Sequence, residues 1–141
     1  MTNEPRETRR SVLVVSEDPA FITGLQEKFE PLGIPVFGCL GPSQAPCLMD
    51  TNGYCSLAEH ATVVLVDTPP SGVFGRWTVI PAGLYAERLA RTHPKTFVVI
   101  SEALLGVSGA SGEIAHVKDR DAARKLLEWL MEPRLVLTSG I

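Results

Sequence analysis

The stretch of the sequence that most constrains the fold is residues 61–67, Ala-Thr-Val-Val-Leu-Val-Asp. Its uninterrupted apolar run is typical of a strand buried on both faces, as in the middle of a parallel sheet. Thr68, Pro69 and Pro70 follow at once, and proline lacks the N–H that a sheet ladder needs. Asp67 is therefore expected at the carboxyl end of a central strand, the edge of an open α/β sheet where ligands collect.

Other apolar runs of strand length accompany this one, and helical patterns lie among them. The expected strands are residues 11–15, 34–38, 96–100 and 114–117, and the expected helices are residues 19–32, 82–92 and 122–131. Asp18 as N-cap with Pro19 in the first turn predicts where the first helix starts, and Asp119 or Asp121 caps the last. Leu84 is expected on the inner side of the middle helix. Because parallel strands need crossover connections, the pattern predicts one α/β domain with a five-stranded parallel sheet and helices on both faces.

The length of 141 residues suits one such domain. We expect a disordered polar lead at residues 1–10, the domain at 11–132 with an irregular insertion at 39–54, and a tail at 133–141. The net charge of −3 argues against a nucleic acid or an anionic membrane as partner. No apolar run approaches the roughly 20 residues of a membrane helix, and no export signal is recognised, so a cytoplasmic protein is expected.

Polar side chains stand where several of the predicted strands end. Glu17 follows the first strand, Asp67 ends the central one, and Ser101 and Lys118 follow the last two. Because the carboxyl ends of parallel strands share one sheet edge, these four are expected to converge. Carboxylates are hard ligands that hold Mg²⁺, and lysine neutralises phosphoryl oxygens while a carboxylate can act as a nucleophile.

At these residues the chain resembles the receiver domain of bacterial two-component response regulators, over about residues 11–131. The matching segments are Val-Val-Ser-Glu-Asp-Pro at 14–19, Val-Leu-Val-Asp at 64–67, Val-Val-Ile-Ser at 98–101, and Lys118. The resemblance implies a flavodoxin-like fold with strand order 2-1-3-4-5. It also implies that Asp67 is the phosphoacceptor, that Ser101 and Lys118 contact the phosphoryl group, and that Glu17 and Asp67 hold Mg²⁺.

The sequence also departs from that family's pattern at several positions. Ser16 stands where the first acidic residue is expected, Asp119 replaces a proline, and Ala115 occupies the place of an aromatic residue with His116 beside it. The segment between Ser101 and Lys118 is short, so the fourth helix is expected to be short or missing. These departures favour an atypical receiver, or a pseudo-receiver that is not switched by phosphate.

Three cysteines are spaced evenly through the insertion and just beyond it. Cys39, Cys47 and Cys55 are eight residues apart (47 − 39 = 8 and 55 − 47 = 8), and His60 follows. This spacing is not the close pairing of structural zinc sites. Ordinary buried thiols, a redox pair or disulfide, and a metal site completed by His60 all remain open at this point.

Three functions follow from these patterns. The first is a single-domain receiver that accepts a phosphoryl group at Asp67 with Mg²⁺, or retains that site only in part. The second is a phosphorylation-independent pseudo-receiver that acts as a protein-binding or dimerisation module, and the third is a thiol or metal sensor that uses the cysteines. We expect a regulatory domain and not an enzyme in its own right. Its expected partner is a histidine kinase, a downstream effector or a second copy of the chain.

Overall fold

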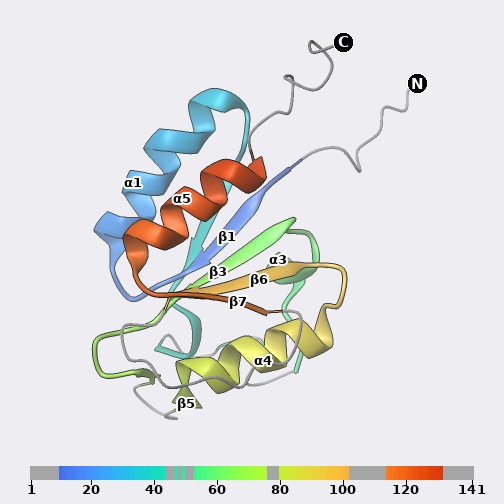
Figure 1. Ribbon diagram of the computed structural model, residues 1–141. Coiled ribbons are helices and arrows are strands. Elements are labelled where there is room, and N and C mark those ends of the chain that lie inside the picture. The colour runs from blue at the N-terminus through green and yellow to red at the C-terminus, as the bar shows by residue number, and fades with distance from the viewer. Residues whose placement is uncertain are drawn as a thin grey trace, which may run out of the picture.

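The computed structural model describes residues 10–43, 47, 49, 53–75, 80–101 and 114–131, and in them a five-stranded parallel sheet forms the centre (Figure 1). Its spatial order is β2-β1-β3-β6-β7, with every pairing parallel. The strands are β1 (Val12–Val15), β2 (Val36–Cys39), β3 (Val63–Asp67), β6 (Phe97–Ser101) and β7 (Ile114–Val117). Counted along the chain, this is the predicted order 2-1-3-4-5, so the predicted flavodoxin-like fold class is confirmed.

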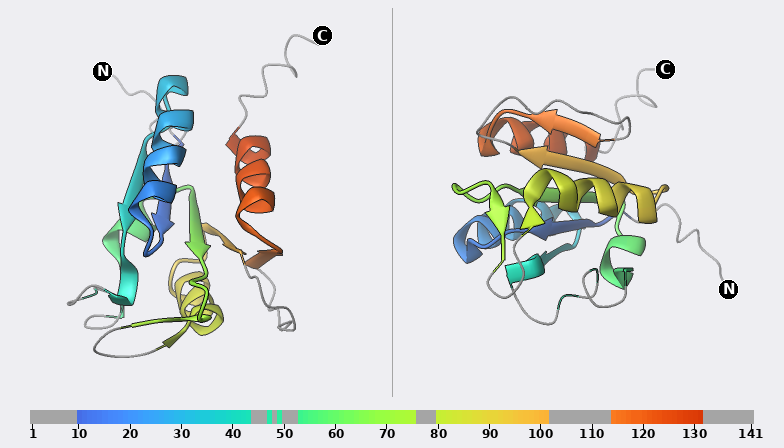
Figure 2. Two further views of the ribbon diagram at one scale, coloured as in Figure 1. Left: turned by 90° about the vertical axis from the view of Figure 1, so that its left-hand side faces the viewer. Right: turned by 90° about the horizontal axis from the view of Figure 1, so that it is seen from below.

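Helices cover both faces of the sheet (Figures 1 and 2). On one face lie α1 (Pro19–Phe29) and α5 (Arg120–Met131); on the other lie α4 (Ala82–Thr92) and the short α3 (Ser56–Glu59). Side chains of the strands alternate between two apolar cores. In β1, Leu13 packs toward α4, whereas Val14 packs toward α1 and α5. Burial on both faces explains the uninterrupted apolar sequences of the central strands β1 and β3, whereas the edge strands β2 and β7 are partly exposed.

The ends of two helices follow the capping rules. The carboxylate of Asp18 accepts a hydrogen bond from the Ala20 N–H at 3.0 Å, with Pro19 in the first turn of α1, as predicted. Asp119, the first of the two predicted alternatives, accepts from the Ala122 N–H at 2.9 Å. After α1 a 3₁₀ turn, η2 (Glu30–Leu32), leads into the left-handed Gly33 with φ 83°.

Two details between β3 and β6 differ from the prediction. Leu84 is 42% exposed and the inner side of α4 is formed by Tyr85, Ala86 and Leu89, so the inward placement of Leu84 was wrong. A two-stranded antiparallel sheet, β4 (Val73–Phe74) with β5 (Ile80–Pro81), lies between β3 and α4, where no strand is predicted. Strands of two residues are too short for hydrophobic periodicity to reveal.

Parts of several predicted regions lie outside the described residues. These are residues 1–9 of the lead, residues 102–113 where a short or missing fourth helix is predicted, and the tail at 133–141. Within the predicted insertion at 39–54, the structure describes a 3₁₀ turn, η3 (Gly41–Ser43), and the buried Met49. None of the described helices has the length and apolar character needed to span a bilayer.

Candidate functional site

Three polar side chains meet at the carboxyl edge of the sheet. Asp67 is the last residue of β3 and is 2% exposed; Ser101 ends β6 directly opposite it, and the buried Ser16 follows β1. The Ser16 hydroxyl donates to Asp67 Oδ2 at 2.7 Å, and the Ser101 hydroxyl donates to Oδ1 at 3.5 Å. Parallel strands thus bring residues from three separate parts of the chain around one buried carboxylate.

Arg120, the first residue of α5, binds this carboxylate through two hydrogen bonds. Its Nε donates to Asp67 Oδ1 at 2.9 Å and its Nη2 donates to Oδ2 at 2.7 Å. The third guanidinium nitrogen, Nη1, lies 3.0 Å from Oδ2 of Asp18, and the guanidinium carbon lies 4.4 Å from the centre of the Phe21 ring. A planar guanidinium matches a carboxylate in this two-point geometry, which a lysine ammonium cannot reproduce.

The charges at this site stabilise one another. The hydrogen bonds to Asp67 raise the pKa of Arg120, against an opposing effect of burial, and Asp18 adds to the increase. The pKa of Asp18 is lowered, chiefly by its hydrogen bond from Arg120. Arg120 therefore joins the end of β3 to the start of α1 and the start of α5 through one cation.

The structure separates the four residues that the sequence groups at this edge. Glu17, Asp67 and Ser101 line one pocket of about 820 Å³, to which Arg120 also contributes. Lys118 is exposed and does not line this pocket. The sequence reasoning missed Arg120, because the family pattern assigns the cation to the lysine that follows the last strand. The sequence did contain one signal for Arg120, because it is a second basic residue that follows Lys118 closely, at the predicted start of the last helix.

The residues predicted to hold Mg²⁺ do not fit the ion in this arrangement. Glu17 lines the pocket, but both oxygens of Asp67 already accept hydrogen bonds from a guanidinium, and Oδ2 also accepts from Ser16. A divalent cation at Asp67 would have to displace or sit against the positive charge of Arg120. Within the described ranges, no three His, Cys, Asp or Glu side chains are placed to share a metal ion.

The three cysteines gather on one apolar core as free thiols. Cys55 is buried, and Cys39 and Cys47 are partly buried against the cluster that contains Tyr85. Cys39 Sγ accepts from the Gly41 N–H at 3.2 Å, and Cys47 Sγ lies 3.9 Å from the Tyr85 hydroxyl. Burial raises the pKa of Cys39 and of Tyr85. A raised pKa leaves less of the reactive thiolate of Cys39 at neutral pH.

A described contact joins one of the three cysteines, Cys55, to His93 and not to the predicted His60. His60 is exposed, and its carbonyl oxygen accepts a hydrogen bond from the Ser11 hydroxyl. His93 is 1% exposed; its Nδ1 lies 2.6 Å from Glu59 Oε1, and its Nε2 accepts from the Cys55 N–H at 3.3 Å. Both ring nitrogens of His93 therefore contact α3 or its N-cap, so His93 has the structural role of linking the end of α4 to α3.

The contact between Arg120 and Asp18 predicts a change in stability with pH. Because the folded state lowers the pKa of Asp18, its contribution is present above the unfolded value of about 3.8 and is lost as the pH falls through the folded value. Asp18→Asn keeps a good N-cap but removes the charge. We expect the stability difference between wild type and this variant to shrink on acidification, measured by urea unfolding at a series of pH values. A difference that is constant or grows in acid would contradict this.

Comparison with known proteins identifies the fold. No family model matches this sequence, and no curated protein does. Among solved structures, a protein described as a pilus assembly protein (CpaE) from Burkholderia thailandensis is similar over 85% of this chain and 96% of its own, with 19% identity and a TM-score of 0.53. A pilus assembly-related protein from Burkholderia pseudomallei is similar over 93% of this chain and 92% of its own, with 17% identity and a TM-score of 0.52.

A response regulator is also similar. DrrB of Thermotoga maritima, an OmpR/PhoB homologue, matches 92% of this chain with 16% identity and a TM-score of 0.54. This chain spans 54% of the length of DrrB. Identities this low establish the fold alone. The chain thus has an α/β flavodoxin-like fold of the receiver type, with a buried, arginine-bound aspartate at the carboxyl edge of its sheet.

Proposed function

We propose that this chain is a pseudo-receiver, a signalling module that acts through protein contacts without phosphorylation of Asp67. The observation that carries the proposal is the two-point contact between the Arg120 guanidinium and the Asp67 carboxylate. A phosphoacceptor carboxylate needs a free oxygen for attack and a bound metal ion to offset the charge of the incoming group. In this chain the protein's own cation takes both oxygens.

The chemistry of the surrounding groups supports the same proposal. Ser16 supplies a neutral hydroxyl that donates to Asp67, where the family pattern has an acid that would help to bind a metal ion. Lys118 is exposed and lies outside the pocket lining. Arg120 also contacts Asp18, so its displacement would break two ion pairs at once.

A second candidate function is phosphate acceptance after Arg120 swings away. One observation favours it, which is that Glu17, Asp67 and Ser101 line the same pocket. Several acidic residues of the pocket lining are exposed, so the pocket is open to solvent. The Arg120 side chain is 45% exposed, so it has room to leave. The third hypothesis, a thiol or metal sensor, has less support, because the pKa of the partly buried Cys39 thiol is raised and His93 has a structural role.

The proposed partner of the module is another protein. The neighbours in fold include one protein described as a pilus assembly protein, one described as pilus assembly-related, and one response regulator. We infer a docking role, in which the domain presents a rigid face to a second protein. Neither a nucleic acid nor a membrane is part of the proposal, in keeping with the net charge of −3.

Treatment with acetyl phosphate and Mg²⁺ tests the proposal directly. We expect no gain of a phosphoryl group in the intact mass of the wild-type chain, because Arg120 shields Asp67. Beryllofluoride with Mg²⁺ should likewise leave its amide NMR spectrum unchanged. A mass gain in wild type that disappears in Asp67→Asn would contradict the proposal and establish the second candidate. A receiver domain of proven activity, treated in parallel, serves as the positive control for the reagents.

A further inference from the structure

The face formed by α1, η2 and α5 exposes apolar side chains around a hollow. Leu32 is 62% exposed and Trp129 is 59% exposed, the two highest values among the large apolar side chains of the described residues. Both line a single pocket of about 590 Å³ between the two helices, and the core residues Phe29 and Met131 form its inner wall. Exposed apolar surface gathered around a hollow is typical of a surface that binds another protein.

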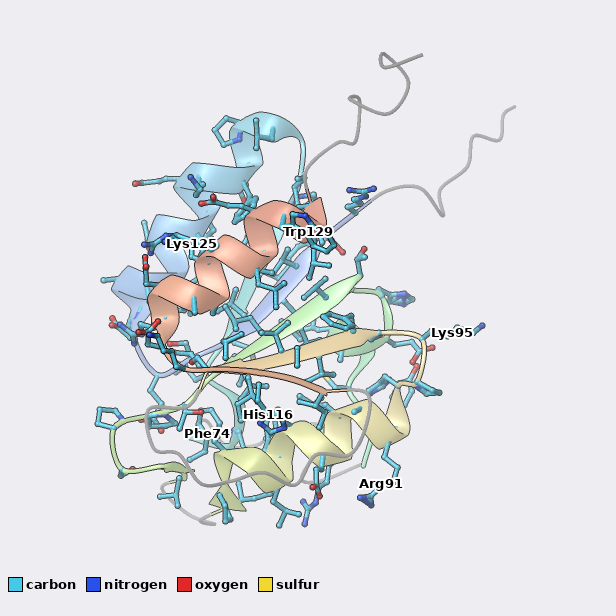
Figure 3. The ribbon with its side chains drawn as sticks, viewed as in Figure 1. Phe74, Arg91, Lys95, His116, Lys125 and Trp129 are labelled. Carbon is cyan, nitrogen blue, oxygen red and sulfur yellow. The ribbon has the colours of Figure 1, made fainter. Side chains whose placement is uncertain are left out.

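The charges on this face have both signs. Lys28 of α1 and Glu128 of α5 form an ion pair at 3.0 Å across the hollow. Lys125 lies one turn before Trp129, so the two side chains share a face of α5 (Figure 3). Lys125 Nζ is 3.6 Å from Asp121, and both side chains are largely exposed, so this pair is weak and readily exchanged.

From these features we infer that the α1–α5 face is a homodimer interface, with a second copy of the chain as its occupant. A two-fold interface uses the same patch on both subunits, so the patch must contain both halves of every contact. This face meets that requirement twice. It carries projecting apolar side chains and a hollow to receive them, and it carries a lysine together with an aromatic ring that can bind a cation.

Helix geometry gives the pairing its register. When two copies of α5 pack antiparallel across a two-fold axis at the level of Leu127, residues equidistant from that level lie opposite each other. Lys125 precedes it by two residues and Trp129 follows it by two, so Lys125 of each copy lies over Trp129 of the other. The two equivalent cation–π contacts replace the weak pair with Asp121. This inference does not depend on the state of Asp67, and its failure would leave the proposed function intact.

Sedimentation velocity of the full chain over a concentration series tests the inference. We expect reversible dimerisation in wild type and a monomer for Trp129→Glu. The matched control is Leu84→Glu, which places the same charge at an exposed leucine on α4, on the opposite face of the sheet, and should leave the dimer intact. Circular dichroism establishes that each variant is folded.

A milder variant keeps the test decisive if Trp129→Glu does not fold. Lys125→Ala should weaken dimerisation by about 5-fold to 30-fold, the equivalent of losing two exposed cation–π contacts. A wild-type chain that stays monomeric at every concentration would overturn the inference, even if the face then binds a different protein. A dimer that tolerates both Trp129→Glu and Lys125→Ala would overturn it as well.

Discussion

Replacement of Arg120 by alanine is expected to lower the free energy of unfolding by about 2 kcal/mol, because it leaves the buried Asp67 carboxylate without its cation. Removal of one partner from a fully buried ion pair costs more than this. Here the Arg120 side chain is 45% exposed, so water reaches the site and reduces the loss. Ser16 and Ser101 also continue to donate to Asp67. Urea unfolding of the two proteins side by side measures the difference.

Arg124→Ala is the matched control for this substitution. It removes the same side chain from the same helix, but its partner Asp121 is 58% exposed, and such surface pairs contribute between 0 and about 1 kcal/mol. We expect the loss for Arg120→Ala to be at least twice that for Arg124→Ala. Equal effects of the two substitutions would show that Arg120 does not hold a buried charge.

The same variant also tests whether Arg120 keeps metal ions from Asp67. Without the guanidinium, the pocket contains Glu17 and an Asp67 carboxylate that no cation neutralises, a pair of hard ligands suited to Mg²⁺. We expect millimolar Mg²⁺ to raise the melting temperature of Arg120→Ala while leaving that of wild type unchanged, by linkage of binding to folding. The double variant Arg120→Ala/Asp67→Asn should lose this response. An equal response in wild type would contradict the idea that Arg120 blocks the site.

Gly41→Ala is expected to destabilise the fold by about 3 kcal/mol, of which about 1 kcal/mol comes from its left-handed backbone and about 2 kcal/mol from overpacking. Its φ is +64°, and an added Cβ would lie 2.6 Å from Cγ1 of Val15. Val15 is 1% exposed in the core, and a β-branched side chain in a buried strand has few other positions. Thermal and urea unfolding measure the loss.

Gly33→Ala separates the two causes. Gly33 also has a left-handed φ of +83°, but nothing lies within 4 Å of its added Cβ. We expect it to cost only about 1 kcal/mol, the backbone part alone. In a Val15→Ala background, Gly41→Ala should become less damaging, because the clashing methyl group is gone. A cost for Gly41→Ala that equals that of Gly33→Ala would contradict the steric argument.

The local sequence determined most of the architecture. Five predominantly apolar runs specified the strands, and the runs of β1 and β3 are the clearest because helices cover both faces of the sheet there. Asp18 with Pro19, and Asp119, marked two helix starts because capping depends on neighbours along the chain. The position of Asp67 beside Ser101 also followed from sequence, because the ends of parallel strands share one edge.

Only the tertiary structure decided which cation meets Asp67. Lys118 and Arg120 both follow β7, and the family pattern favoured Lys118. The packing of α5 against the sheet places its first residue, Arg120, over the carboxylate, 53 residues away in sequence, and leaves Lys118 in solvent. A contact between residues so far apart in the sequence depends on where the helix α5 begins relative to the sheet edge and on the direction of its axis. The position and direction of α5 depend on how its core residues, such as Ala123 and Leu127, pack against side chains from distant parts of the chain, which no local sequence pattern reports.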